Sequence, residues 1–330
     1  MDFTKDKNSS ISVKDIIEEL IPDYPSIDDE DFINKLSAKE ELYELRATST
    51  EEPPKKQGEL LKSQKMMQRI FSPHTPYTNA LIYHAMGSGK SSTACGIVEN
   101  FKKEMNPDGS VKKPALVIVK NPALIQSFTK EITNVCTAGV YDPKFTRKEI
   151  LKGDVSMTEQ KATRRLNENI RKSYEIITKT TLFNKNLSDY DIKKKYSNRI
   201  IFIDEAHVFR IQSKKGKKVE KEKKEDELSK EEEGDGISEI AEEDDSESVD
   251  KRTYDKMHHF LHTVEGCRIF LMTGTPIWDK TNEIASLMNL ILPLSDQLPT
   301  GEKFMNEYFD EDGNILEDKV DDLRNILKGR

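Results

Sequence analysis

The chain has 330 residues, of which 34% are charged; its formal net charge is −8 and its mean hydropathy is −0.72. This length allows about two domains, and no apolar run approaches the roughly 20 residues that a bilayer-spanning helix needs. The polar N-terminus lacks the apolar core of a signal peptide. The composition therefore excludes an integral membrane protein, and we expect a soluble intracellular protein with no membrane partner.

Most of the negative charge comes from one segment. Residues 211–252 contain 16 acidic and 10 basic residues and almost no large apolar ones, so they cannot bury enough surface to fold. We interpret this segment as a disordered charged insertion; a charged tether for a partner or for nucleic acid is the alternative. The rest of the chain is close to neutral, so its overall charge leaves room for a local basic groove.

The three cysteines lie far apart in the sequence. Cys95, Cys136 and Cys267 form no pair with metal-ligand spacing. They are expected to be buried reduced thiols, with neither a zinc site nor a disulfide scaffold.

In chain order, the sequence predicts an N-terminal extension, one lobe that carries the insertion, and a tail. Residues 1–57 form the extension, which is expected to be partly disordered; residues 58–210 and 253–293 form the lobe; and residues 294–330 form an acidic helical tail. Within the lobe, strands are predicted at 79–83, 115–119, 174–178, 199–203 and 268–272, and helices at 58–71, 92–101, 121–135 and 279–292. Apolar strands that alternate with amphipathic helices indicate an α/β fold with a mainly parallel sheet between helices.

The first strand leads into a glycine-rich turn that predicts a phosphate-binding loop. Such a turn between a strand and a helix points several backbone N–H groups at one spot, and glycine can adopt the positive φ that the turn requires. The lysine would contact the β- and γ-phosphates, and the first serine after it would bind Mg²⁺. A solvated glycine loop is the alternative. The candidate nucleotide-binding residues are Gly87, Ser88, Gly89, Lys90, Ser91 and Ser92.

Two carboxylates follow the strand at 199–203. Asp204 and Glu205 come at its carboxyl end, the edge of an open α/β sheet at which ligands bind. Asp204 would hold Mg²⁺ and Glu205 would orient and deprotonate an attacking water. An ordinary helix N-cap is the alternative interpretation.

Hydroxyl side chains follow the strand at 268–272. Thr273 and Thr275 at this edge could sense the nucleotide state through His207, or they could form a simple strand-to-helix turn.

Taken together, these three motifs resemble motifs I, II and III of superfamily 2 helicases and translocases. The segment that begins at Ala115 is similar to motif Ia, and the segment that ends at Pro293 resembles the Snf2-type variant. More narrowly, the stretch from Ser72 to His84 is similar to the DEAH-box ATPases of large DNA viruses. That group includes the poxvirus-type nucleoside triphosphate phosphohydrolases and the early transcription factor helicases.

This resemblance implies a RecA-like P-loop NTPase lobe that binds ATP and Mg²⁺ and contacts DNA or RNA. It assigns Lys90 and Ser91 to motif I, Asp204, Glu205 and His207 to motif II, and Thr273 and Thr275 to motif III. Gln64 matches either the upstream glutamine that reads adenine or a surface helix residue. Asn121 and Pro122 correspond to positions that touch the nucleic-acid backbone, or they simply start a helix. If the protein is viral, the host cytoplasm or the virion is its expected location.

The chain departs from the family after Pro293. Complete members continue into a second lobe with motifs IV to VI, whose arginines complete the ATP site; only 37 residues remain here. We therefore expect an N-terminal piece that binds Mg·ATP weakly and hydrolyses it poorly unless a second polypeptide supplies those motifs. RNA polymerase or other transcription machinery is a further candidate partner. The alternatives are a different P-loop NTPase and a non-catalytic helicase fragment or transcription-factor subunit.

Overall fold

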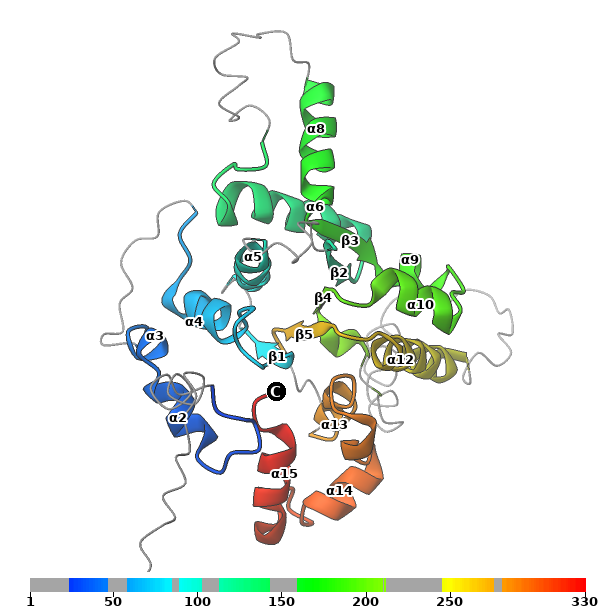
Figure 1. The fold of residues 1–330 in the computed structure, drawn as a ribbon. Coiled ribbons are helices and arrows are strands. Elements are labelled where there is room, and N and C mark those ends of the chain that lie inside the picture. The colour runs from blue at the N-terminus through cyan, green and yellow to red at the C-terminus, as the bar shows by residue number, and fades with distance from the viewer. Residues whose placement is uncertain are drawn as a thin grey trace, which may run out of the picture.

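A five-stranded parallel sheet forms the centre of the computed structural model, which describes residues 24–46, 58–84, 89–102, 113–142, 159–209, 211, 245–275 and 281–330 (Figure 1). The strand order is β1-β5-β4-β2-β3, and every paired neighbour is parallel. The strands are β1 (Asn79–Tyr83), β2 (Ala115–Val119), β3 (Tyr174–Thr178), β4 (Ile200–Asp204) and β5 (Arg268–Thr273). These bounds match the predicted strands to within one residue at each end, and the α/β fold is confirmed.

The strands are apolar throughout because both faces of the sheet are covered. All five residues of β2 are buried, and successive side chains enter different cores. Leu116 and Ile118 belong to one hydrophobic core, whereas Val117 belongs to the other. The same alternation occurs in β4, where Phe202 faces away from Ile201.

Helices from the first part of the lobe cover one face. Phe71, Ile97, Phe128 and Ile170 from these helices or their ends share a core with Phe270 of β5. The elements are α4 (Lys62–Ile70), α5 (Lys90–Phe101), α6 (Pro122–Lys130), the π-helix η1 (Glu131–Cys136) and α8 (Glu159–Arg171). Figure 1 shows α8 projecting away from the body of the protein, beyond the sheet.

The remaining helices of the lobe and those of the C-terminal tail cover the other face. Tyr196, Met257, Leu287 and Phe304 are fully buried here. The elements are α9 (Lys179–Phe183), α10 (Asp189–Tyr196), η3 (Ala206–Phe209), α12 (Asp245–Thr263), α13 (Glu283–Met288), η4 (Leu294–Asp296), α14 (Glu302–Tyr308), η5 (Glu317–Lys319) and α15 (Val320–Leu327). Among the helices of the described ranges, none has the length and apolar character that crossing a bilayer requires.

The N-terminal and C-terminal segments pack against each other beside β1. Helix α2 (Phe32–Ala38) lies on the side of the molecule that faces α15 in Figure 1, and α3 (Glu40–Tyr43) continues from it toward α4. Lys328 donates to the backbone carbonyl of Asp29 at 3.0 Å, and the Phe32 ring meets that of Tyr77 edge to face at 5.6 Å. Helix α12 begins at Asp245, within the segment that the sequence assigns to the charged insertion; residues 212–244 lie outside the described residues. The domain boundaries themselves stay predictions.

The expectation that all cysteines are reduced thiols was wrong for two of them. Cys95 of α5 and Cys136 of η1, which are 41 positions apart in the sequence, form a disulfide. They meet because η1 packs along α5, a contact that cysteine spacing cannot reveal. Cys267 is free, and burial raises the pKa of its thiol.

Candidate nucleotide-binding site

The phosphate loop ends where α5 begins. Gly89 has φ of +85° and forms the N-cap of α5, so the predicted left-handed glycine is present at this position. Lys90 and Ser91 are the first two residues of the helix, where free backbone N–H groups and the helix dipole favour an anion. Gly87 and Ser88 lie outside the described residues, and their role stays a prediction.

The side chain of Gln64, on α4, contacts the end of this loop. Its side-chain amide donates to the backbone carbonyl of Gly89 at 3.2 Å and accepts from the backbone N–H of Leu61 at 3.0 Å. A Cβ at Gly89 would lie 2.3 Å from the Gln64 amide nitrogen, and the φ of +85° would strain any other residue, so both the space and the backbone favour glycine here. Gln64 is fully buried, and its interpretation as a surface residue was therefore wrong. Its reading of adenine stays a prediction.

Ser92 points toward η1. Its hydroxyl donates to the carboxylate of Glu131 at 2.5 Å, and the side chain is 1% exposed. This hydrogen bond to Glu131 occupies the hydroxyl of Ser92 in the structure. A direct contact between Ser92 and the nucleotide stays a prediction. Glu131 was missed by the sequence reasoning, since it belongs to no motif and lies 39 positions from its partner.

The acidic pair lies at the carboxyl end of β4, as predicted. Asp204 is the last residue of the strand, and Glu205 follows with φ of +52°, a conformation that is strained for any residue with a Cβ. This turn directs Glu205 to Lys90, whose ammonium nitrogen lies 2.7 Å from its Oε1. The two side chains are only 27% and 13% exposed, so their charges attract more strongly than a surface pair.

His207 and Thr273 join this pair into one cluster. His207 Nδ1 lies 3.0 Å from the Thr273 hydroxyl and 3.2 Å from Glu205 Oε2. The same hydroxyl accepts from the backbone N–H of Thr275 at 3.1 Å, which is ordinary turn chemistry. That these threonines sense the nucleotide state through His207 stays a prediction. The site cluster therefore consists of Lys90, Glu205, His207 and Thr273, with Asp204 beside it.

Asp204 is held in an unfavourable electrostatic setting. Burial, reinforced by the charge of Glu205, raises the pKa of its carboxyl to about 6, although Lys90 opposes the shift. A divalent cation would relieve this cost. Asp204 and the hydroxyl of Ser91 offer the oxygen ligands that Mg²⁺ prefers, and this ion commonly uses one or two carboxylates together with substrate phosphates. The donor set therefore fits Mg²⁺.

Replacing Asp204 with asparagine should stabilise the metal-free protein at neutral pH. The pKa of Asp204 is higher in the folded protein than in the unfolded chain, so the folded protein binds the carboxyl proton more tightly. Protonation of Asp204 therefore stabilises the fold below about pH 4, and this stabilisation is lost as the pH rises through about 6. We expect Asp204→Asn to raise the free energy of unfolding at pH 7 by about 1–3 kcal/mol, and to flatten its pH dependence in this window.

Urea unfolding of the metal-free protein across this pH range provides the measurement. Asp321→Asn is the matched control, because that carboxyl is 82% exposed and should change stability by less than ~0.5 kcal/mol. A less stable Asp204→Asn variant at pH 7 would show that the buried carboxylate is stabilising as it stands.

Comparison with known proteins identifies the family. Residues 51–276, more than half of the chain, match the family model described as "Type III restriction enzyme, res subunit". The chain belongs to this family. It is a helicase-type lobe of superfamily 2, of the kind that occurs in large DNA viruses.

Viral relatives support the assignment. The chain is 29% identical to "Putative helicase 087L" of Invertebrate iridescent virus 3, over 87% of this chain and 26% of that protein. It is 26% identical to "Putative helicase 009L" of Frog virus 3, over 81% of this chain and 23% of that one. It is also 26% identical to "Putative ATP-dependent RNA helicase R563" of Acanthamoeba polyphaga mimivirus, over 87% and 42%. The chain thus spans less than half of the length of these relatives.

The helicase fold explains why the site residues converge. Parallel strands β1, β5 and β4 are adjacent in the sheet, so their carboxyl ends bring the three motifs to one edge. The backbone N–H of His84 donates to the carbonyl of Thr273 at 3.1 Å, which ties the start of the phosphate loop to the end of β5, the strand that carries the third motif.

Proposed function

We propose that this helicase-family chain is the ATP-binding lobe of a nucleic-acid-dependent ATPase that hydrolyses ATP by attack of a water molecule. The contact of 2.7 Å between Lys90 and Glu205 carries the proposal, because it brings a phosphate-binding cation next to a candidate general base. The two residues are 115 positions apart in the chain and belong to different motifs.

Each residue of the site has a distinct task in this reaction. Lys90 and the amide groups at the start of α5 bind the phosphates, and Glu205 accepts a proton from the attacking water. Asp204 and Ser91 would hold Mg²⁺, which neutralises phosphate charge when it is bound. His207 and Thr273 link the general base to the end of β5 through the 3.0 Å contact between them. This link would communicate the state of the nucleotide to the rest of the lobe.

Lys90 has to exchange partners when nucleotide binds. The structure pairs its ammonium with the carboxylate of Glu205. Phosphate oxygens carry more negative charge than this single carboxylate and would draw the ammonium toward the loop. The exchange frees Glu205 to contact a water. Ligand binding thus switches the general base from a paired to an available state.

Nucleic acid would bind along the same edge of the sheet, near the start of α6. Asn121 caps this helix by accepting from the backbone N–H of Leu124 at 3.2 Å, and Pro122 occupies the first turn. The helix-start interpretation of both residues is therefore confirmed, and contact with a nucleic-acid backbone remains part of the proposal. Lys120 and Asn121 are exposed at this edge. Motifs IV to VI would be supplied by a second lobe, either farther along a longer protein or in a second polypeptide.

Titration with Mg·ATP, followed by phosphate release with and without single-stranded DNA or RNA, tests the function. We expect saturable binding, and turnover that rises when nucleic acid is added. Turnover that responds to a small phosphoryl acceptor and ignores nucleic acid would indicate a different P-loop NTPase. Nucleotide binding without turnover, even after a polypeptide with motifs IV to VI is added, would indicate a non-catalytic subunit.

A further inference from the structure

The π-helix η1 fastens the phosphate-loop helix at two points. It continues α6 without a break, and its wider turn is visible in the hydrogen bond of 3.1 Å from the Thr137 N–H to the Ile132 carbonyl. Its first residue, Glu131, binds Ser92, and its last residue, Cys136, is bonded to Cys95. Both partners lie on α5, which packs against η1.

The π geometry brings both ends of η1 toward α5. In an α-helix, residues five positions apart point about 140° away from each other, since each residue turns the chain by about 100°. In a π-helix, hydrogen bonds connect residues five apart, so Glu131 and Cys136 lie on the same side. Single π-turns occur frequently at functional sites. The disulfide fixes the far end of the contact, and the carboxylate meets the first turn of α5.

The contact of Glu131 is placed where it can influence phosphate binding. Ser92 is the third residue of α5, two positions after Lys90, and its side chain is buried. A hydroxyl-to-carboxylate hydrogen bond of 2.5 Å is of the short, charge-assisted kind. A negative charge beside the first turn of a helix is also favoured by the helix dipole. Glu131 thus restrains the turn whose N–H groups and Lys90 face the phosphates.

We propose that Glu131 is a positioning residue of the nucleotide site. It holds the first turn of α5 through Ser92, as Gln64 holds the preceding residue, Gly89, from the other helix. Glu131 belongs to η1 and Gln64 to α4, so side chains from two different elements form hydrogen bonds with the start of α5. This inference rests on the proposed function, because it assigns Glu131 a role in binding ATP. It also gives Ser92 an indirect role in place of a direct contact with the ligand.

A double-mutant cycle of nucleotide affinity provides the test. We measure the Kd for Mg·ATP with wild type, Glu131→Ala, Ser92→Ala and the double variant. Each single substitution should weaken binding about five- to twentyfold, because a positioned turn is lost. The double variant should be no weaker than the single ones, since both remove the same hydrogen bond. Glu131→Gln keeps an acceptor for the Ser92 hydroxyl and should restore most of the affinity.

Two controls separate positioning from general destabilisation. Glu168→Ala removes an acidic side chain that is 55% exposed on α8, and it should leave the Kd unchanged. Thermal unfolding of each variant establishes that binding is measured on folded protein. If Glu131→Gln is as stable as wild type but does not restore the affinity for Mg·ATP, the proposal is overturned. Additive losses in the double variant also overturn it, because they show that Ser92 touches the nucleotide independently.

If Lys90→Ala weakens binding but Glu131→Ala does not, only this inference fails. If wild type shows no binding that depends on Lys90, the proposed function fails and this inference falls with it.

Discussion

Lys90→Ala is expected to weaken Mg·ATP binding by about 30- to 150-fold. The ammonium supplies charge-assisted hydrogen bonds to the phosphates, and losing such bonds costs about 2–3 kcal/mol. The substitution also leaves Asp204 and Glu205 adjacent without their cation. Because Lys90 lowers the pKa of Asp204, this pKa should rise above its present value of about 6 in the variant. Isothermal titration gives the affinity, and NMR titration of the carboxyl group gives the pKa.

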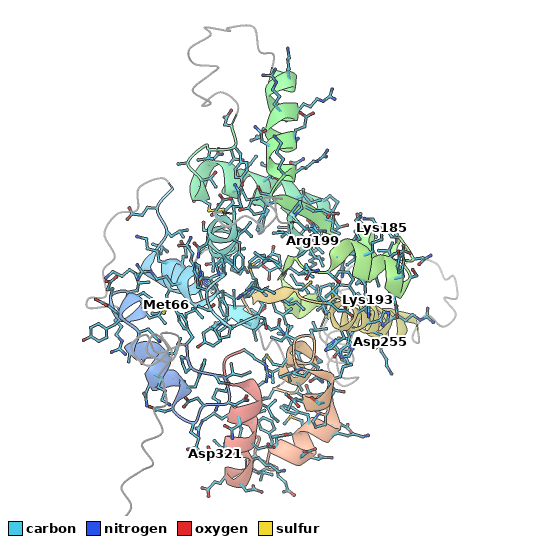
Figure 2. All side chains as sticks on the ribbon, viewed as in Figure 1. Met66, Lys185, Lys193, Arg199, Asp255 and Asp321 are labelled. Atoms are coloured by element: carbon cyan, nitrogen blue, oxygen red, sulfur yellow. A yellow bond between two sulfur atoms is a disulfide. The ribbon has the colours of Figure 1, made fainter. Side chains whose placement is uncertain are left out.

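Lys193→Ala is the matched control for this experiment. Lys193, labelled on α10 in Figure 2, also lies 2.7 Å from a glutamate, Glu265, but its side chain is 50% exposed. An exposed ion pair contributes little, so we expect unchanged ATP affinity and a stability change below ~1 kcal/mol. Equal losses of affinity in both variants would contradict the site, because they would show that binding depends on overall charge.

Glu205→Gln should abolish turnover while it tightens binding. An amide cannot take a proton from water, and removing a general base lowers a rate by about 10²- to 10⁴-fold. The same change breaks the ion pair between Lys90 and Glu205, so the ammonium becomes available to phosphate. We therefore expect a severalfold lower Kd for ATP, equivalent to about 1 kcal/mol. Single-turnover phosphate release and equilibrium titration measure the two effects separately.

Glu265→Gln provides the control, since this glutamate forms the matched ion pair with Lys193. It should alter neither the affinity nor the rate. Phosphate release at the wild-type rate by Glu205→Gln would remove Glu205 from the role of general base. Weaker ATP binding by that variant would show that the Lys90 contact assists binding and does not compete with it.

The positions of the strands followed from composition alone. A fully apolar run such as Ala115–Val119 has no polar face to turn to solvent, and its length of five residues favours a strand buried on both faces over a helix. Such apolar runs do not predict the order of the strands in the sheet. β5 pairs with both β1 and β4, and it thereby inserts Thr273 between the phosphate loop and the acidic pair. That order depends on helix packing over both faces, which local sequence does not encode.

Sequence and tertiary structure contributed different parts of the site. The sequence by itself determined the residue types that chemistry requires, because a glycine turn with Lys90 and a strand-end pair of carboxylates have recognisable local patterns. The tertiary structure decided the supporting contacts: Gln64 under Gly89, Glu131 on Ser92, and the disulfide of Cys95. These contacts join residues 25 to 41 positions apart through packing of α4 and η1 on α5. Side chains that act by packing against a distant helix leave no local pattern, and only the folded chain brings them together.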